Sequence, residues 1–256
     1  MKPRLGDNYR NVPASAAQPV ADVFVVATDR ASPATTEALA PQLTAEERIR
    51  GGRFVREEDR GTYAITRALV RVTLSKYAPT APLEWQFVTN RHQCPRVHPS
   101  QAGSPPLTFN VSHTRGLVAL AVTRGHRLGV DVEQIDRRVM EGVAERHFAP
   151  AEVRELRGIA DADQAAAFFE YWTLKEAYIK ARGMGLALPL DGFAFALHGS
   201  RPPTISFAEG FDDVPARWQF WQTWPTPGHR LALAIEREGA DLPVTLTPVP
   251  LDALLP

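Results

Sequence analysis

The sequence lacks several features by which a class of protein is commonly identified. It holds a single cysteine, Cys94, which excludes an internal disulfide and a thiol-rich zinc site and suits a reducing compartment. Lys plus Arg and Asp plus Glu each number 29, so no net charge attracts nucleic acid or an anionic membrane. No apolar stretch approaches the roughly 20 residues that span a bilayer. We therefore predict a soluble cytoplasmic protein that binds neither nucleic acid nor a membrane.

What is present is enough apolar material for a large core, since 44% of the 256 residues are hydrophobic. The order strand, helices, strands occurs twice, which indicates an internal duplication although no residue-level repeat is visible. The predicted fold class is therefore α+β, with two similar halves and an active site in the cleft between them. The predicted parts are a flexible leader at 1–19, an N-terminal half at 20–127, a C-terminal half at 128–238 and a Pro-rich tail at 239–256.

Local patterns predict the individual helices and strands. Strands are expected at 21–29, 83–88, 107–112, 117–123, 128–133, 192–197, 203–208, 217–223 and 230–236. Helices are expected at 45–54 with Thr44 as N-cap, from there to about residue 77, within 137–158, and at 161–181. The strands between 107 and 133 are predicted to form one meander. The stretch 90–106 is predicted to be a surface or binding loop, and the tail to lie outside or be partly disordered.

The helix that ends near residue 77 has two different faces. At about 100° per residue, Ile65 and Leu69 share one face, whereas Arg60, Arg67 and Arg71 fall within about 40° of each other on another. The pattern predicts a helix that buries one side and carries a basic stripe.

A carboxylate in an unusual setting occurs in 171-YWTLKEAYIK-180. On a helical wheel Glu176 falls within about 60° of Trp172, on an apolar face, with Lys180 one turn further on. One interpretation is an ordinary Glu–Lys helix pair. The other is a functional carboxylate, because a carboxylate that faces a core requires a cation or a task.

Two further carboxylates lie in 129-GVDVE-133. Side chains alternate along a strand, so Asp131 and Glu133 point to the same face. They form either a solvated acidic face or a site for a hard divalent cation such as Mg²⁺, with Glu176 as a third carboxylate if the long helix packs over this strand.

The segment 109-FNVSHT-114 invites a hydrolase interpretation, but Ser112 and His113 are adjacent on a strand and cannot pair as nucleophile and base. They are either an unremarkable strand end or donors of hydrogen bonds to phosphate oxygens. Together with the carboxylates and Lys180, this favours a phosphoryl-transfer site that acts by positioning and charge neutralisation.

Taken in order, 109-FNVSHT-114, 129-GVDVE-133 and 172-WTLKEAYIKARGMGLALPLDGF-193 resemble the motifs of the Sfp-type 4′-phosphopantetheinyl transferases. The segments 50-RGGRFVREEDR-60 and 146-RHFAPAE-152 also fit that family. The resemblance runs from about residue 45 to 195. It implies a pseudo-twofold pair of α+β halves.

The resemblance also implies an activity of the holo-[acyl-carrier-protein] synthase type. Such an enzyme transfers the phosphopantetheine arm of coenzyme A to a serine of an apo acyl, peptidyl or aryl carrier protein. Adenosine 3′,5′-bisphosphate is released, and Mg²⁺ is the cofactor. Two halves in one chain would complete the site internally, so we expect a monomer.

Carried over by position, the family's roles fall on eight residues. The metal carboxylates would be Asp131, Glu133 and Glu176, and Glu176 is also the expected base for the serine hydroxyl. Lys180 is expected to be catalytic and to contact the pyrophosphate. The other residues expected to bind coenzyme A are Arg50, Asn110, Ser112 and His113.

One departure from the family pattern lies before the F-N-V-S-H motif. The family carries a Gly-Lys-Pro segment there, and this chain has Gln93 and Cys94 before Pro95. Backbone contacts to the nucleotide could survive that change, but a side-chain phosphate contact would need Arg91 or Arg96.

Two other functions fit the same residues. The first is another Mg²⁺-dependent phosphotransferase or a pyrophosphatase built on the same carboxylates. The second is a module that binds coenzyme A or a carrier protein without turnover, which the intact set of carboxylates and Lys180 argues against.

Overall fold

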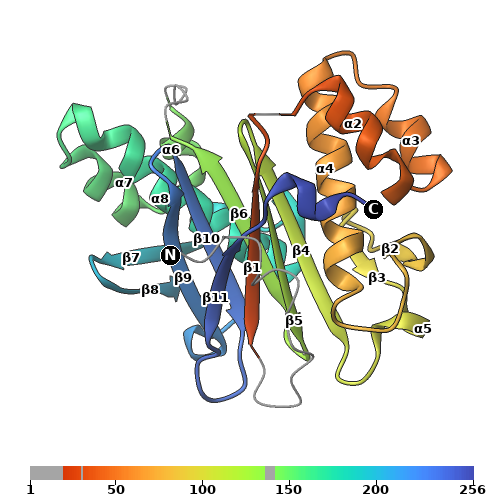
Figure 1. Cartoon of the computed structure of the whole chain (residues 1–256). Helices are drawn as coiled ribbons and strands as arrows, with labels where there is room; N and C mark the ends of the chain where they lie inside the picture. Colours follow the sequence, from red (N-terminus) through yellow and green to blue (C-terminus); the bar gives the residue numbers. More distant parts are fainter. Residues whose placement is uncertain (1–19, 30, 136–141) are drawn as a thin grey trace, which may run out of the picture. The chain divides into compact units, whose positions relative to one another are not determined.

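A computed structural model describes residues 20–29, 31–135 and 142–256, so the predicted leader at 1–19 lies outside the described residues. The chain divides into two compact units (Figure 1). Counting only the described residues, the first unit contains those up to Val88 together with Pro95–Gly125 and Pro243–Pro256, and the second contains Thr89–Cys94 and those from His126 to Leu242. Both units combine helices with antiparallel strands, which confirms the predicted α+β class. Among the described residues, no helix has the length and apolar character that crossing a bilayer requires.

The first unit is built on a four-stranded sheet with the order β11-β1-β5-β4. Its strands are β1 (Ala21–Ala27), β4 (Leu107–Thr114), β5 (Leu117–Arg124) and β11 (Val244–Pro248), with a separate pair formed by β2 (Phe87–Thr89) and β3 (Pro95–Val97). Its helices are α2 (Pro33–Leu39), α3 (Ala45–Gly51), α4 (Glu57–Leu74) and α5 (Pro99–Ala102). The apolar face of α4, including Ile65 and Leu69, lies in the core of this unit, as its periodicity predicted.

The start of α3 follows from its sequence. The Thr44 side chain accepts a hydrogen bond from the Glu47 amide, and the Glu47 carboxylate accepts one from the Thr44 amide. This capping box satisfies two of the amides that a helix N-terminus leaves without partners. The predicted N-cap is confirmed.

The predicted basic stripe of α4 is wrong at Arg71, whose side chain is buried rather than exposed. Its Nε and Nη2 donate to the two oxygens of Glu47 at 2.8 and 3.0 Å, and its Nη1 donates to the carbonyls of Pro82 and Trp85. Arg67 also pairs with Glu47. A buried guanidinium requires this full set of acceptors, which come from segments distant in the sequence.

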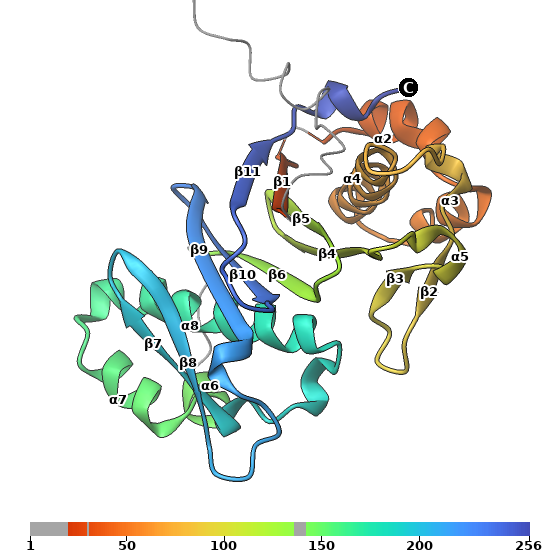
Figure 2. The ribbon, with the colours of Figure 1, turned by 90° about the horizontal axis from the view of Figure 1, so that it is seen from below.

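The second unit contains a three-stranded sheet with the order β6-β10-β9 and a hairpin of β7 and β8 (Figure 2). Its strands are β6 (Leu128–Gln134), β7 (Phe193–His198), β8 (Arg201–Phe207), β9 (Trp218–Thr226) and β10 (His229–Glu236). Its helices are α6 (Val143–His147), α7 (Pro150–Arg157) and α8 (Asp161–Arg182). Helix α8 packs against β6 and β10.

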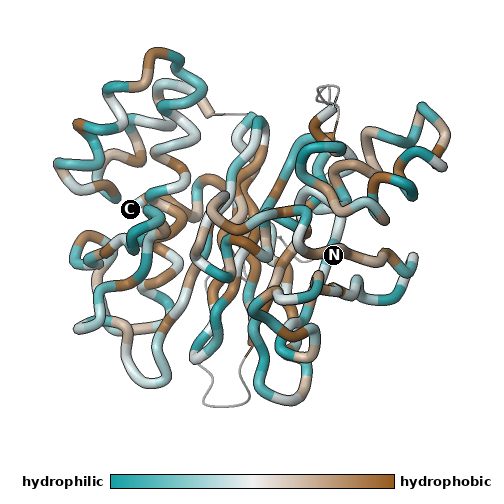
Figure 3. Tube along the Cα trace, turned by 180° about the vertical axis from the view of Figure 1, so that it is seen from behind, coloured by the Kyte–Doolittle hydropathy of each residue, from teal (hydrophilic) through white to brown (hydrophobic). Residues whose placement is uncertain are grey.

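Hydrophobic residues are frequent along the strands, whereas many loop residues are hydrophilic (Figure 3). The core of the second unit is rich in aromatic rings that contact one another edge to face, such as Tyr178 against Phe193 and Phe195 against Phe220. The first pair joins α8 to β7, and the second joins β7 to β9.

Three local predictions are wrong. The expected meander is divided, because β4 and β5 pair in the first unit whereas β6 pairs with β10 in the second. The expected strand at 83–88 begins as a 3-10 turn at Pro82–Glu84, and only β2 follows. The expected loop at 90–106 contains β3 and α5.

The Pro-rich tail was expected to lie outside the core or to be partly disordered, and this is also wrong. Its strand β11 pairs in parallel with β1, from Ala21 opposite Val244 to Val25 opposite Pro248. Beyond it, Val249 and Leu254 are buried in the core of the first unit. Proline is tolerated here because β11 is an edge strand, where one side of the backbone needs no donor.

Candidate active site

A glycine sets the distance between α8 and β6. A Cβ built on Gly129 would lie 2.2 Å from the Ala177 carbonyl oxygen and 2.4 Å from the Ala181 nitrogen. The α8 backbone therefore passes directly over this point of the strand. Because side chains alternate along β6, Asp131 and Glu133 share the face of Gly129 and point toward α8, as the spacing predicted.

Lys180 of α8 reaches down to β6. Its Nζ lies 2.7 Å from Asp131 Oδ1 and 3.3 Å from the Val130 carbonyl oxygen. The sequence suggested Glu176 as the partner of Lys180, one helical turn away, but the ion pair that the geometry gives it is with Asp131. The Asp131 carboxylate is buried, and a charge-assisted hydrogen bond to a buried carboxylate is stronger than an ion pair at the surface.

Glu176 is half-buried, and the charges of Asp131, Glu133 and Lys180 act on it. Burial, more than any other cause, raises the pKa of its carboxyl to about 7, and the nearby negative charges of Asp131 and Glu133 raise it further, while Lys180 opposes the shift. The structure therefore brings Asp131, Glu133, Glu176 and Lys180 together. A carboxyl that titrates near neutrality beside two other carboxylates can accept a proton, or can share a cation with them.

The adjacent Lys175 has a different environment from Glu176, and the sequence did not single it out. Its Nζ lies 2.8 Å from Glu152 on α7, with both side chains fully buried. It also donates to the carbonyls of Leu190 and Phe193 at 2.7 and 2.8 Å. Burial lowers the pKa of Lys175 and raises the pKa of Glu152. In the sequence, this buried pair is indicated only by the position of a charged residue on the side of the helix that faces the core.

The predicted residues of the N-terminal half belong to the first unit. Asn110 and Ser112 are buried on β4, whereas His113, the next residue after Ser112, is exposed. This alternation confirms that Ser112 and His113 face opposite ways. Arg50 is exposed in the last turn of α3.

The segment in which this chain departs from the family motif keeps a glycine-like backbone. Gln93 has a φ of 62°, in the left-handed region that glycine favours. The turn is held by Asn90, whose side chain accepts hydrogen bonds from the amides of His92 and Cys94 and donates to the Gly183 carbonyl at 2.7 Å. The main-chain course is thus compatible with the motif although the side chains differ.

Divalent metal ions require several donor atoms at one point. Among the residues that the structure describes, no group of three or more His, Cys, Asp or Glu side chains is arranged closely enough to hold a metal ion. The donor chemistry nevertheless suits a hard cation, because all three side chains near Lys180 are carboxylates and their proximity opposes the ionisation of Glu176.

Comparison with known proteins agrees with the motifs. Residues 127–235 match the model of the 4′-phosphopantetheinyl transferase superfamily, and residues 30–125 match that of the 4′-phosphopantetheinyl transferase N-terminal domain. The chain is similar to the 4′-phosphopantetheinyl transferase HetI of Nostoc sp., with 33% identity over 66% of this chain and 71% of the relative.

Two relatives from Bacillus subtilis cover more of the chain. The 4′-phosphopantetheinyl transferase ffp is 28% identical over 86% of this chain and 93% of the relative. The 4′-phosphopantetheinyl transferase Sfp, from strain 168, is 26% identical over 83% of this chain and 90% of the relative. Because both family models match in order and a relative is 33% identical over 71% of its length, the chain belongs to the 4′-phosphopantetheinyl transferase superfamily.

Proposed function

We propose that this protein transfers the 4′-phosphopantetheine arm of coenzyme A to a serine of an apo carrier protein. The observation that carries the proposal is the convergence of Asp131, Glu133, Glu176 and Lys180 where α8 crosses β6, in a chain of this family. In the reaction, the serine oxygen forms a bond to the phosphorus that carries the pantetheine arm. The bond from that phosphorus to the bridging pyrophosphate oxygen breaks, and adenosine 3′,5′-bisphosphate leaves.

The residues that would hold Mg²⁺ are Asp131, Glu133 and Glu176. The ion, when bound, would neutralise negative charge on the pyrophosphate. Support comes from the donor set, which is entirely oxygen, and from the negative charges of Asp131 and Glu133, which add to the effect of burial in raising the pKa of Glu176 to about 7.

Glu176 is also the group best suited to take the proton from the serine hydroxyl. A base whose pKa lies near the working pH is ionised often enough to act and basic enough to accept a proton. Lys180, held by Asp131 at 2.7 Å, is positioned to bind a phosphate oxygen close to the same carboxylates.

The first unit would supply the other contacts to coenzyme A. Ser112 and His113 lie at the end of β4, where a hydroxyl and an imidazole can donate to phosphate oxygens. Arg50 is exposed and suited to a nucleotide phosphate, and Asn110 would shape the pocket from the strand. We further propose that the enzyme acts in the cytoplasm as a monomer, since both sets of residues belong to one chain.

The activity is tested by incubating the protein with coenzyme A, Mg²⁺ and several apo carrier proteins and weighing each carrier by mass spectrometry. We expect a phosphopantetheine adduct and loss of signal in excess EDTA. Glu176→Gln and Asp131→Asn should each reduce turnover by about 10²-fold or more while the circular dichroism spectrum is retained. Near-normal turnover in either variant would contradict the roles proposed for these carboxylates.

The same experiment separates the two rival functions. A pyrophosphatase would release adenosine 3′,5′-bisphosphate from coenzyme A without a carrier, whereas a transferase releases it only when an apo carrier is present. A binding module would retain coenzyme A or the carrier and release nothing.

A further inference from the structure

A polar cavity of about 260 Å³ opens in the second unit beside the first half of α8. Its walls are the turn between β7 and β8, part of β9, and side chains from α8 and β10. Arg201 and Arg230 contribute two positive charges to the lining, and Glu170 contributes one negative charge. We call it the Arg201–Arg230 pocket. Its net charge is positive and favours an anionic group.

Arg230 is fixed in one position at the base of this pocket. One Nη lies 3.0 Å from Glu170 and 2.9 Å from the Gln222 side-chain oxygen, and the guanidinium stacks 4.7 Å from the centre of the Trp224 ring. The pairing of β10 with β9 shifts register beside Arg230, and such a bulge re-aims a side chain. Only 11% of the Arg230 side chain is exposed, so the cation is largely shielded from water.

Arg201 also lines the pocket but, unlike Arg230, it is exposed and its side chain is not held by neighbouring groups that the structure describes. It begins β8 directly after the two-residue turn Gly199–Ser200 and is exposed. Its backbone pairs with His198 in the β7–β8 hairpin, but its side chain makes no hydrogen bond or ion pair within the part of the chain that the structure describes. Trp224, on whose ring Arg230 stacks, is 41% exposed. Arginine and tryptophan are the residue types most enriched where proteins bind other proteins tightly.

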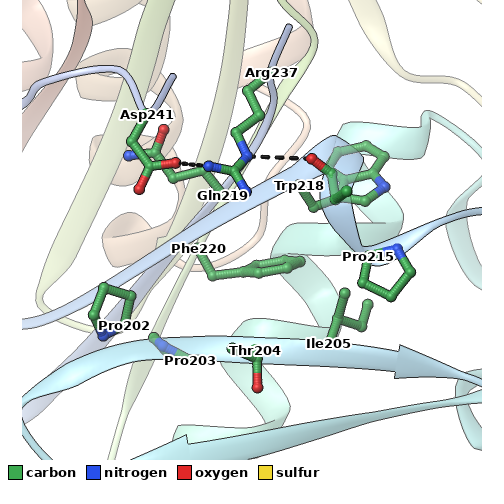
Figure 4. Close-up of a pocket in the computed structure, with 11 residues that line it drawn as sticks. Pro202, Pro203, Thr204, Ile205, Pro215, Trp218, Gln219, Phe220, Arg237 and Asp241 are labelled. Atoms are coloured by element: carbon green, nitrogen blue, oxygen red, sulfur yellow. Dashed lines mark hydrogen bonds and ion pairs between the residues drawn. The ribbon is translucent and has the colours of Figure 1, made fainter. Parts of the chain in front are cut away.

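An apolar groove of about 320 Å³ adjoins the pocket and shares Phe220 with it (Figure 4). The polar groups at its edge are already occupied: Gln219 exchanges two hydrogen bonds with the Leu242 backbone, and Arg237 pairs with Asp241. The groove therefore suits an apolar side chain rather than a polar one. The two hollows together fit an acidic side chain next to an apolar one.

The pocket lies close to the carboxylates along α8. Glu170 precedes Glu176 by six residues, about 9 Å along the helix axis, and Arg230 of β10 is the cross-strand neighbour of Glu133 on β6. A protein interface of standard size covers about 800 Å² per partner and so extends about 16 Å from its centre. A carrier that presents its serine at Glu176 would therefore also cover this pocket.

Resting on the proposed function, we infer that the Arg201–Arg230 pocket is a docking site for the carrier protein and receives an acidic side chain of it. The neighbouring groove holds an apolar side chain of the same surface. Arg230 forms the fixed base, and Arg201 contributes the exposed charge that attracts the carrier and discriminates among carriers.

Steady-state kinetics with an apo acyl carrier protein test this inference through Arg201→Glu. We expect the KM for the carrier to rise about ten-fold, because like charges then face each other, with kcat and the KM for coenzyme A unchanged. In 1 M NaCl the two proteins should converge, since charges are screened within about 3 Å. Arg154→Glu is the matched control, because Arg154 is an exposed arginine of the same unit on α7, outside the pocket.

Each outcome bears on a different claim. A carrier KM that rises only in Arg201→Glu and converges at high salt supports the docking site. An unchanged carrier KM, or an equal rise in Arg154→Glu, overturns it while the transfer activity stands. If wild-type protein modifies no carrier at all, the proposed function itself fails, and the docking site fails with it.

Discussion

At Glu176, burial and the two neighbouring carboxylates of Asp131 and Glu133 raise the pKa of the side chain in the same direction. Because the folded state raises the pKa of this group from 4.5 to about 7, its ionised form is disfavoured by folding. Below pH 4.5 the carboxyl is protonated in both the folded and the unfolded chain. Between about pH 4.5 and 7 only the unfolded chain loses the proton, so the free energy of unfolding falls as pH rises, and above pH 7 the penalty is complete.

We therefore predict that Glu176→Gln, in EDTA, gains stability relative to wild type as pH rises from 4.5 to 7, by at most about 3 kcal/mol. Urea unfolding at several pH values measures this difference. Mg²⁺ at pH 8 should then raise the unfolding midpoint of wild type more than that of Glu176→Gln. A pH-independent difference between the two proteins would show that the Glu176 environment is not as described.

At the scale of elements, the buried pair of Lys175 and Glu152 joins α8 to α7. The Glu152 carboxylate also accepts hydrogen bonds from the amides of Ala149 and Phe195, both at 2.8 Å, so the pair reaches β7 as well. All its hydrogen-bonding groups are engaged, which is the condition under which a buried ion pair is tolerated. The pair holds α8 on a helix face about 100° from that of Glu176.

Removing one partner of this pair should be more damaging than neutralising both. We predict that Lys175→Met lowers the free energy of unfolding by about 3–5 kcal/mol, because the Glu152 charge is left buried and unpaired. The double variant Lys175→Met, Glu152→Gln should recover part of the loss, since glutamine can still accept the amide hydrogen bonds. The exposed pair Arg157–Glu145 is the control, and Arg157→Met should change stability little. A double variant no more stable than Lys175→Met would refute this account.

The crossing of α8 over β6 depends on Gly129. We predict that Gly129→Ala lowers the free energy of unfolding by about 3 kcal/mol or more and abolishes transfer, because its Cβ would overlap the helix backbone. Gly228→Ala is the matched control, since nothing lies within 4 Å of its added Cβ. It should change stability by less than about 1 kcal/mol, as measured by urea unfolding. Equal effects of the two substitutions would mean that close helix approach does not matter.

At the scale of the whole molecule, the end of the chain completes the sheet of the first unit. Leu254 is fully buried in that core, and the adjacent Leu255 is 40% exposed. We predict that Leu254→Ala lowers the free energy of unfolding by about 2–5 kcal/mol, whereas Leu255→Ala changes it by less than about 0.5 kcal/mol. Thermal or urea unfolding of the full chain distinguishes them. If Leu254→Ala proved as stable as wild type, the tail would not be part of the core.

Strong local periodicity explains which features were predictable from the residues alone. The long helix expected at 161–181 is α8, and the expected strands at 217–223 and 230–236 are β9 and β10. The common face of Asp131 and Glu133 and the partly buried position of Glu176 required only the periods of a strand and a helix. Each of these features is set by neighbours within a few residues in the chain.

The remaining features depend on partners that are distant in the chain. Arg71 is buried because it pairs with Glu47, 24 residues away. Strand β6 pairs with β10, about 100 residues later, and not with the strands that precede it in the sequence. The tail joined β1, with more than 220 residues between them. Lys180 forms its ion pair with Asp131 on β6, 49 residues away in the chain. Local pattern defined which residues could form the site, but only the folded chain decided which charges meet, because burial and non-local pairing are properties of the tertiary structure.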